Sequence, residues 1–228
     1  MEAHGFTMRS FAFLDEARVQ ILSIDIDGIG AKAAVKSSVS AVEAFLNEFC
    51  QIGFGYEKHN HSIRNPMVKM AKALQEAEDR RASPKKKIQV AYEALAGKKL
   101  KKGNTPNFQR FGIVLDVRNE LAHPKASVLN ISGNGIEPPK FEKLLIKKLK
   151  SNGFGKNNDS YDWVTFIDNK DFALWAYQAC IGVIGLVIDQ IPYKEAIDSY
   201  KEMYSIDIPK PDQWPNRKIL VTPTEHLV

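Results

Sequence analysis

The amino-acid sequence predicts an all-α fold, built as a bundle of helices around one core. Apolar residues recur at three- and four-residue steps wherever a period can be read, which is the period of an α-helix. Glycine and proline fall between these stretches, at places where helices start and end. The chain has 228 residues, 44% of them hydrophobic and 26% charged, which is enough for one sizeable core. We therefore expect a single domain over residues 1–228.

The first core helix is expected over residues 33–53. Its apolar stripe repeats every three or four residues and comprises Val35, Val39, Val42, Leu46 and Phe49. Gly28 and Gly30 precede this stretch, and Gly53 and Gly55 follow it, so glycine flanks both expected ends.

Residues 65–96 form the second expected core segment, made of two helices. The apolar stripe of the first, over 65–80, comprises Met67, Met70, Ala71 and Leu74. Ser83 and Pro84 then predict the start of a shorter helix that runs to Ala96, because proline fits the first helical position.

The third core helix is expected over residues 106–123. It starts with Pro106, and its apolar residues are Phe108, Ile113, Val114, Val117 and Leu121. It must end near His123, because Pro124 disfavours helical geometry in the residue before it.

Residues 125–168 predict an irregular insertion before the last core helix. Its first part is rich in asparagine, glycine and proline and is expected to be a loop. A short basic helix over 141–150 and a second loop over 153–160 follow.

The last core helix is expected over residues 169–191. Its segment Phe172–Ile188 is the most apolar in the chain and is interrupted by Gln178 alone. A membrane-spanning helix needs about twenty such residues, and aspartates flank this segment. We therefore expect the central helix of a soluble bundle and no membrane partner. An amphipathic stretch to Tyr204 and a proline-rich C-terminal tail over 206–228 complete the chain.

The charge balance favours a polyanionic partner. Lysine plus arginine number 32 against 27 for aspartate plus glutamate, a formal net charge of +5. The excess gathers in short lysine clusters, each of which would also suit a solvated helix edge. The candidate RNA-binding lysines are Lys85, Lys86, Lys87, Lys98, Lys99 and Lys125.

Other residue patterns predict no disulfide, metal or cofactor. Cys50 and Cys180 lie in apolar runs without a CxxC pairing, which favours a reducing compartment. The start of the chain lacks the features of a signal peptide, so we expect a cytoplasmic protein. Glu57, His59 and His61 alternate along the chain, but no second ligand pair with metal spacing accompanies them, so a polar loop is expected there.

Three polar residues, Arg118, Asn119 and His123, lie near the end of the third core helix. On a wheel of about 100° per residue with Val117 at the centre of the apolar stripe, all three occupy the opposite arc. The small Ala122 lies between the arginine and the histidine. We therefore expect these residues to face a cleft or a partner surface.

A histidine beside an arginine is the pair that metal-free RNA cleavage requires. The imidazole of His123 would take the 2′-hydroxyl proton or protonate the leaving oxygen, and Arg118 would stabilise charge on the phosphorane. Asn119, one turn before His123, would orient the imidazole or bind a phosphate oxygen. The candidate catalytic residues are therefore Arg118, Asn119 and His123.

The arginine, the polar residue after it and the histidine resemble the R-x4-6-H motif of the HEPN superfamily of helical ribonucleases. The segment from Ser38 to Glu48 is similar to the first core helix of such domains. The resemblance implies an antiparallel helical bundle that forms a homodimer, in which Arg118, Asn119 and His123 of two subunits line one composite cleft.

The same resemblance implies an endoribonuclease that cuts RNA without metal, as a toxin of a toxin–antitoxin pair or a phage-defence effector. An antitoxin or another defence-system protein would then be a second partner. Some related toxins carry a tyrosine shortly after the histidine, as a site of nucleotide addition. Here Pro124 to Ser127 follow instead, so that regulation is not implied.

Two other readings of the same residues remain open. In the first, the bundle is a non-catalytic module that binds RNA or protein through Arg118 and His123, or serves only for assembly. In the second, Arg118 forms an ion pair with a carboxylate such as Asp116, and His123 merely caps the helix.

Overall fold

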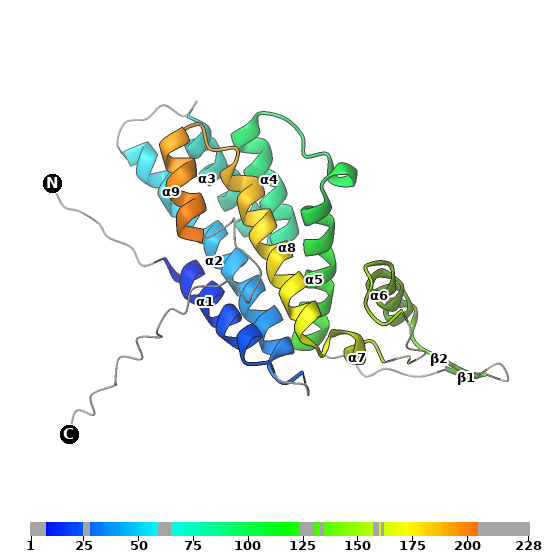
Figure 1. The fold of residues 1–228 in the computed structure, drawn as a ribbon. Coiled ribbons are helices and arrows are strands. Elements are labelled where there is room, and N and C mark those ends of the chain that lie inside the picture. Colours follow the sequence, from blue (N-terminus) through cyan, green and yellow to red (C-terminus); the bar gives the residue numbers. More distant parts are fainter. Residues whose placement is uncertain are drawn as a thin grey trace, which may run out of the picture.

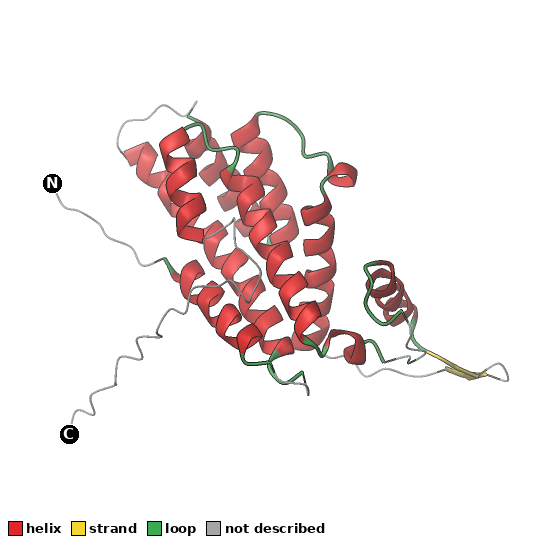
Figure 2. Ribbon diagram, viewed as in Figure 1, coloured by secondary structure: helices red, strands yellow, loops and turns green. Residues whose placement is uncertain are grey.

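The computed structural model describes residues 8–24, 28–58, 65–123, 130–132, 135–156, 160 and 162–204. Most of these residues are α-helical (Figure 2), so the prediction of an all-α fold is confirmed. The helices of the bundle are α1 (Arg9–Leu22), α2 (Ala31–Lys58), α3 (Pro66–Asp79), α4 (Pro84–Ala96), α5 (Pro106–Ala122), α8 (Lys170–Ile188) and α9 (Lys194–Tyr204).

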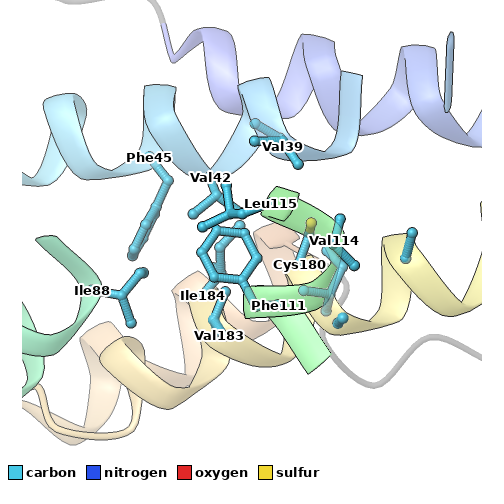
Figure 3. Close-up of a cluster of buried hydrophobic side chains, with 14 of the residues drawn as sticks. Val39, Val42, Phe45, Ile88, Phe111, Val114, Leu115, Cys180, Val183 and Ile184 are labelled. Carbon is cyan, nitrogen blue, oxygen red and sulfur yellow. The ribbon is translucent and has the colours of Figure 1, made fainter. Parts of the chain in front are cut away.

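The core of the bundle forms around α2, which contacts α1, α3, α4, α5 and α8 (Figure 1). Figure 3 shows the buried side chains where α2, α4, α5 and α8 meet. Those labelled are Val39, Val42, Phe45, Ile88, Phe111, Val114, Leu115, Cys180, Val183 and Ile184. Both α5 and α8 thus share one apolar interior with α2, and this fixes the position of α5 in the bundle.

Most helix boundaries lie within a few residues of their expected positions. Before α2, Gly28 and Gly30 adopt φ values of +70° and +101°, a left-handed geometry that glycine tolerates and that breaks the helix. Ser83 caps α4 by accepting a hydrogen bond from the backbone N–H of Lys86 at 3.3 Å. The short 3-10 turn η1 (Lys102–Asn104) then leads into α5.

The expected end of the first core helix at residue 53 is wrong. The helix α2 continues through Gly53 and Gly55 to Lys58. Gly53 lies where α3 packs closely, because a Cβ there would be 2.5 Å from the carbonyl oxygen of Met67. This glycine therefore marks a close helix contact, a role that its neighbours in sequence do not reveal.

One helix of the bundle, α1, falls outside the expected core segments. Its buried residues recur at helical spacing and are Ser10, Leu14, Ala17 and Ile21. A buried polar cluster joins α1 to α2 and α9. The carboxylate of Glu48 accepts hydrogen bonds from the backbone N–H of Ser10, at 3.0 Å, and from its hydroxyl. The Ser10 hydroxyl also lies 3.0 Å from the hydroxyl of Tyr204.

The first part of the insertion at 125–168 is a hairpin, although a loop was expected. Its strands are β1 (Asn130–Ser132) and β2 (Gly135–Glu137), which pair antiparallel with Asn130 opposite Glu137. The Gly-Asn dipeptide between them in the sequence is typical of a two-residue hairpin turn. A segment rich in asparagine, glycine and proline can therefore form a hairpin when its strands have only three residues each.

The expected basic helix of the insertion is α6 (Lys140–Ser151), which packs against α5. Its buried residues are Leu145 and Leu149. On its exposed side, the ammonium of Lys148 donates to the carboxylate of Asp116 on α5 at 2.7 Å. After α6, Phe154 packs against Phe172 of α8, with ring centroids 5.0 Å apart, and α7 (Val164–Ile167) leads into α8.

Among the described residues, α8 alone is long and apolar enough to cross a membrane. Two thirds of its apolar window, 67%, is buried inside the bundle. In Figure 1 it runs beside α2 and α5, both of which it contacts. This burial agrees with the expectation that α8 is a central helix of the core.

Candidate functional site

The helix α5 contains Arg118 and Asn119, and His123 is its C-cap. The arc of α5 that holds Arg118 and Asn119 is not open along the whole helix. Phe108, Phe111 and Leu115 lie on the same arc and are buried. The reason is that α5 packs against α2, α4, α6 and α8, so it has neighbours on several sides. Among the three candidate residues, Asn119 and His123 at its C-terminal end are exposed, and Arg118 is half-buried.

Arg118 is held in place by a carboxylate of another helix. Its guanidinium donates to the carboxylate of Glu43 on α2, and the two side chains are 21% and 41% exposed. An ion pair of Arg118 with a carboxylate was one reading of the sequence, and it forms with Glu43 and not with Asp116, which accepts from Lys148. The ion pair with Glu43 therefore fixes where the charge of Arg118 lies.

Asn119 and His123 are exposed at the C-terminal end of α5. The backbone N–H of His123 donates to the carbonyl oxygen of Asn119 at 2.9 Å, and the helix ends there. His123 lies five positions after Arg118, which on an ideal α-helix amounts to a rise of about 7.5 Å and a rotation of about 140°. Ideal helix geometry therefore places the two residues near one helix end but on different faces.

Glu43 is a residue of this site that the sequence analysis did not identify. Its only signal is that it is the single charged residue between Lys36 and Glu48, in the segment that resembles a HEPN core helix. Its partner, Arg118, lies 75 residues further along the chain. Only the packing of α2 against α5 brings the two side chains together.

The lysines expected to bind RNA differ in their surroundings. Lys85 is half-buried, with its ammonium 5.1 Å from the ring centroid of Phe108, and this burial lowers the pKa of the ammonium. Lys87 forms an ion pair with Glu78. Of the others, Lys86, Lys98 and Lys99 are exposed, and Lys125 lies outside the described residues.

No group of three histidine, cysteine or acidic side chains that would suit a metal ion occurs in the described part of the chain. His59 and His61 lie outside that part. The two cysteines, Cys50 and Cys180, are free and buried, and burial raises the pKa of both thiols. The candidate polar groups near the end of α5 are Arg118, Asn119 and His123, with Glu43 bound to the arginine.

The chain matches no protein-family model, no curated protein and no solved structure.

Proposed function

We propose that this protein is a metal-independent endoribonuclease of the HEPN type, acting on cytoplasmic RNA as a toxin or a phage-defence effector. The observation that carries the proposal is the arrangement near the end of α5. Asn119 and His123 are exposed there, and Arg118 is anchored one turn earlier by Glu43. This arrangement supplies a proton-transfer group and a fixed positive charge.

In the proposed reaction, the 2′-hydroxyl of a ribose attacks the adjacent phosphorus. His123 takes the hydroxyl proton or protonates the departing 5′-oxygen, and the guanidinium of Arg118 stabilises the charge that develops on the phosphoryl oxygens. Asn119 binds a phosphate oxygen or orients the imidazole. The products are a 2′,3′-cyclic phosphate and a 5′-hydroxyl end.

A homodimer is part of the proposal, because the resemblance to HEPN domains implies a cleft that two subunits share. On an ideal helix, positions 118 and 123 lie about 140° apart around the axis, which also favours a cleft built from two copies. Two copies that meet at the ends of α5 would supply both groups to each scissile phosphate, as the resemblance to HEPN domains implies. The exposed lysines Lys86, Lys98 and Lys99 would add affinity for the RNA backbone that does not depend on sequence.

The test is cleavage of total RNA by the purified full-length protein in excess EDTA. Wild type is compared with Arg118→Ala and His123→Ala. The matched control is Arg110→Ala, because Arg110 is an exposed arginine on the same helix. We expect a loss of at least about 100-fold in the two site variants, the size of a general acid–base contribution, and no change in the control.

Identification of the RNA ends completes the test. Cyclic phosphate ends that disappear in both site variants would support the mechanism. Equal activity in His123→Ala and wild type, with circular dichroism showing that both are folded, would overturn it.

The ion pair of Arg118 with Glu43 favours a second candidate function. A guanidinium that already has a carboxylate partner is suited to a structural or binding role, so the bundle would bind RNA or a protein such as an antitoxin without cutting. This candidate predicts RNA binding that weakens as salt rises, without cleavage at any metal concentration, and with no effect of His123→Ala.

A further inference from the structure

A pocket adjoins the carboxylate that holds Arg118. It opens between α1 and α2 and has a volume of about 490 Å³, within the range of about 300–1,000 Å³ that is typical of small-molecule sites. Six of the residues that line it are Arg9, Phe13, Glu43, Asn47, Glu48 and Gln51. Glu43 lines the pocket and also binds Arg118, so one side chain connects the pocket to the proposed catalytic arginine.

The two carboxylates in the pocket wall both have polar partners. Glu48 is buried and accepts two hydrogen bonds from Ser10, and the charge of Glu43 is paired with that of Arg118. Arg9, which is exposed, adds a positive charge at the edge of the pocket. The wall therefore does not repel a ligand that carries a phosphate.

Two amide side chains in the pocket are available to a ligand. Asn47 and Gln51 are exposed, lie one helical turn apart on α2, and have no hydrogen-bond partner within the described part of the chain. Each offers donors and an acceptor in one plane. The half-buried ring of Phe13 on α1 supplies an aromatic wall in the same pocket.

We propose that this pocket binds an adenine base. An asparagine or glutamine amide pairs with adenine through two hydrogen bonds, one donated to the ring nitrogen and one accepted from the exocyclic amine. An aromatic ring such as Phe13 stacks on an unpaired base. The inference rests on the proposed function, because the adenine would belong to an RNA substrate whose scissile phosphate is bound by Arg118. A free adenine nucleotide presents the same base and is the second possible source of the ligand.

The first measurement is binding of adenosine monophosphate to the full-length protein by isothermal titration calorimetry, with uridine monophosphate in parallel. We expect tighter binding of the adenine nucleotide, weakened at least about fivefold by Asn47→Ala or Gln51→Ala. The control is Gln178→Ala, because Gln178 is an exposed amide on α8 that does not line the pocket. Equal affinity for both nucleotides, or no effect of either pocket variant, would overturn the proposal.

A second measurement separates the two sources of the base. Cut sites mapped on an RNA of random sequence would show an adenine preference that the Asn47→Ala variant loses if the base belongs to the RNA. Inhibition of cleavage by adenosine monophosphate without such a preference would identify a free nucleotide. The calorimetry does not depend on cleavage, so the two proposals can fail separately. A protein that binds adenine specifically but does not cut RNA would contradict the proposed nuclease function and support the adenine site.

Discussion

At the scale of single residues, the structure shows that the guanidinium of Arg118 is bound by the carboxylate of Glu43. The guanidinium is anchored by Glu43, so its remaining N–H groups are oriented before any substrate arrives. Such an anchor reduces the reorganisation that phosphate binding would otherwise require. Glu43 is thus a positioning residue in the proposed mechanism, since it acts through the arginine.

Glu43→Gln tests this positioning role. We expect kcat for RNA cleavage to fall about tenfold with KM little changed, because the arginine would be held less firmly as charge develops. The free energy of unfolding should change by less than about 1 kcal/mol, since the ion pair is partly exposed. Glu57→Gln is the matched control, because Glu57 of the same helix forms an exposed ion pair with Lys72 at 2.7 Å. Equal losses of kcat in both variants would contradict the assignment.

A second residue prediction concerns alkaline stability. Burial raises the pKa of the Tyr204 phenol above its ordinary value of 10.0. The folded protein therefore keeps a proton that the unfolded chain loses, so the free energy of unfolding falls as the pH rises above about 10. Urea denaturation between pH 7 and pH 11 measures this slope.

Tyr204→Phe removes the titrating group and serves as the comparison. The variant should be less stable at pH 7 by about 1 kcal/mol, because it loses the hydrogen bond with Ser10. Above pH 10 the free energy of unfolding of the variant should fall less steeply than that of wild type. The two slopes should differ by up to about 1.4 kcal/mol per pH unit, the contribution of one proton. The same slope in both proteins would mean that Tyr204 does not titrate differently in the folded state.

At the scale of elements, the contact between α2 and α3 depends on a glycine within a helix. A Cβ at Gly53 would lie 2.5 Å from the carbonyl oxygen of Met67 and 2.6 Å from the Cβ of Ala71. Neither atom can move without shifting the α3 backbone. By contrast, a Cβ at Gly55, two residues later in the same helix, would meet nothing within 4 Å.

These two glycines make a matched pair of variants. Gly53→Ala should lower the free energy of unfolding by about 1–3 kcal/mol, because the added methyl forces the helices apart. Gly55→Ala should raise it by about 0.5–1 kcal/mol, because alanine favours helix over glycine and the site has room. Urea denaturation of both variants measures the difference. A stabilised Gly53→Ala protein would show that α2 and α3 do not pack this closely in solution.

At the scale of the whole molecule, the proposed mechanism needs two chains. Sedimentation equilibrium should give about twice the chain mass of 25.6 kDa at micromolar concentration. The mass should be the same in Arg118→Ala, so that loss of activity in that variant is not a loss of assembly. A monomeric protein that nevertheless cleaves RNA would contradict the composite cleft and would require both groups to act from one chain.

The sequence alone determined the helical class of this protein and most of its helices. Apolar spacing located α2, α3 and α5, because a helix that buries one face must repeat every three or four residues. The helix α8 was located by its nearly unbroken apolar run. Proline and serine located the starts of α4 and α5, because the preferences of helix termini are local. The same reasoning identified Arg118, Asn119 and His123 as candidates, since their spacing within one helix is visible in the sequence.

The tertiary structure decided what those residues touch. It placed Glu43 on Arg118 and left Lys148 to bind Asp116, pairings that depend on which helices pack together. It also turned Gly53 from an expected helix end into a site of close packing. The physical reason is the same in each case. Contacts between residues far apart in the chain depend on the positions of whole helices, and those positions follow from burying all the apolar faces at once.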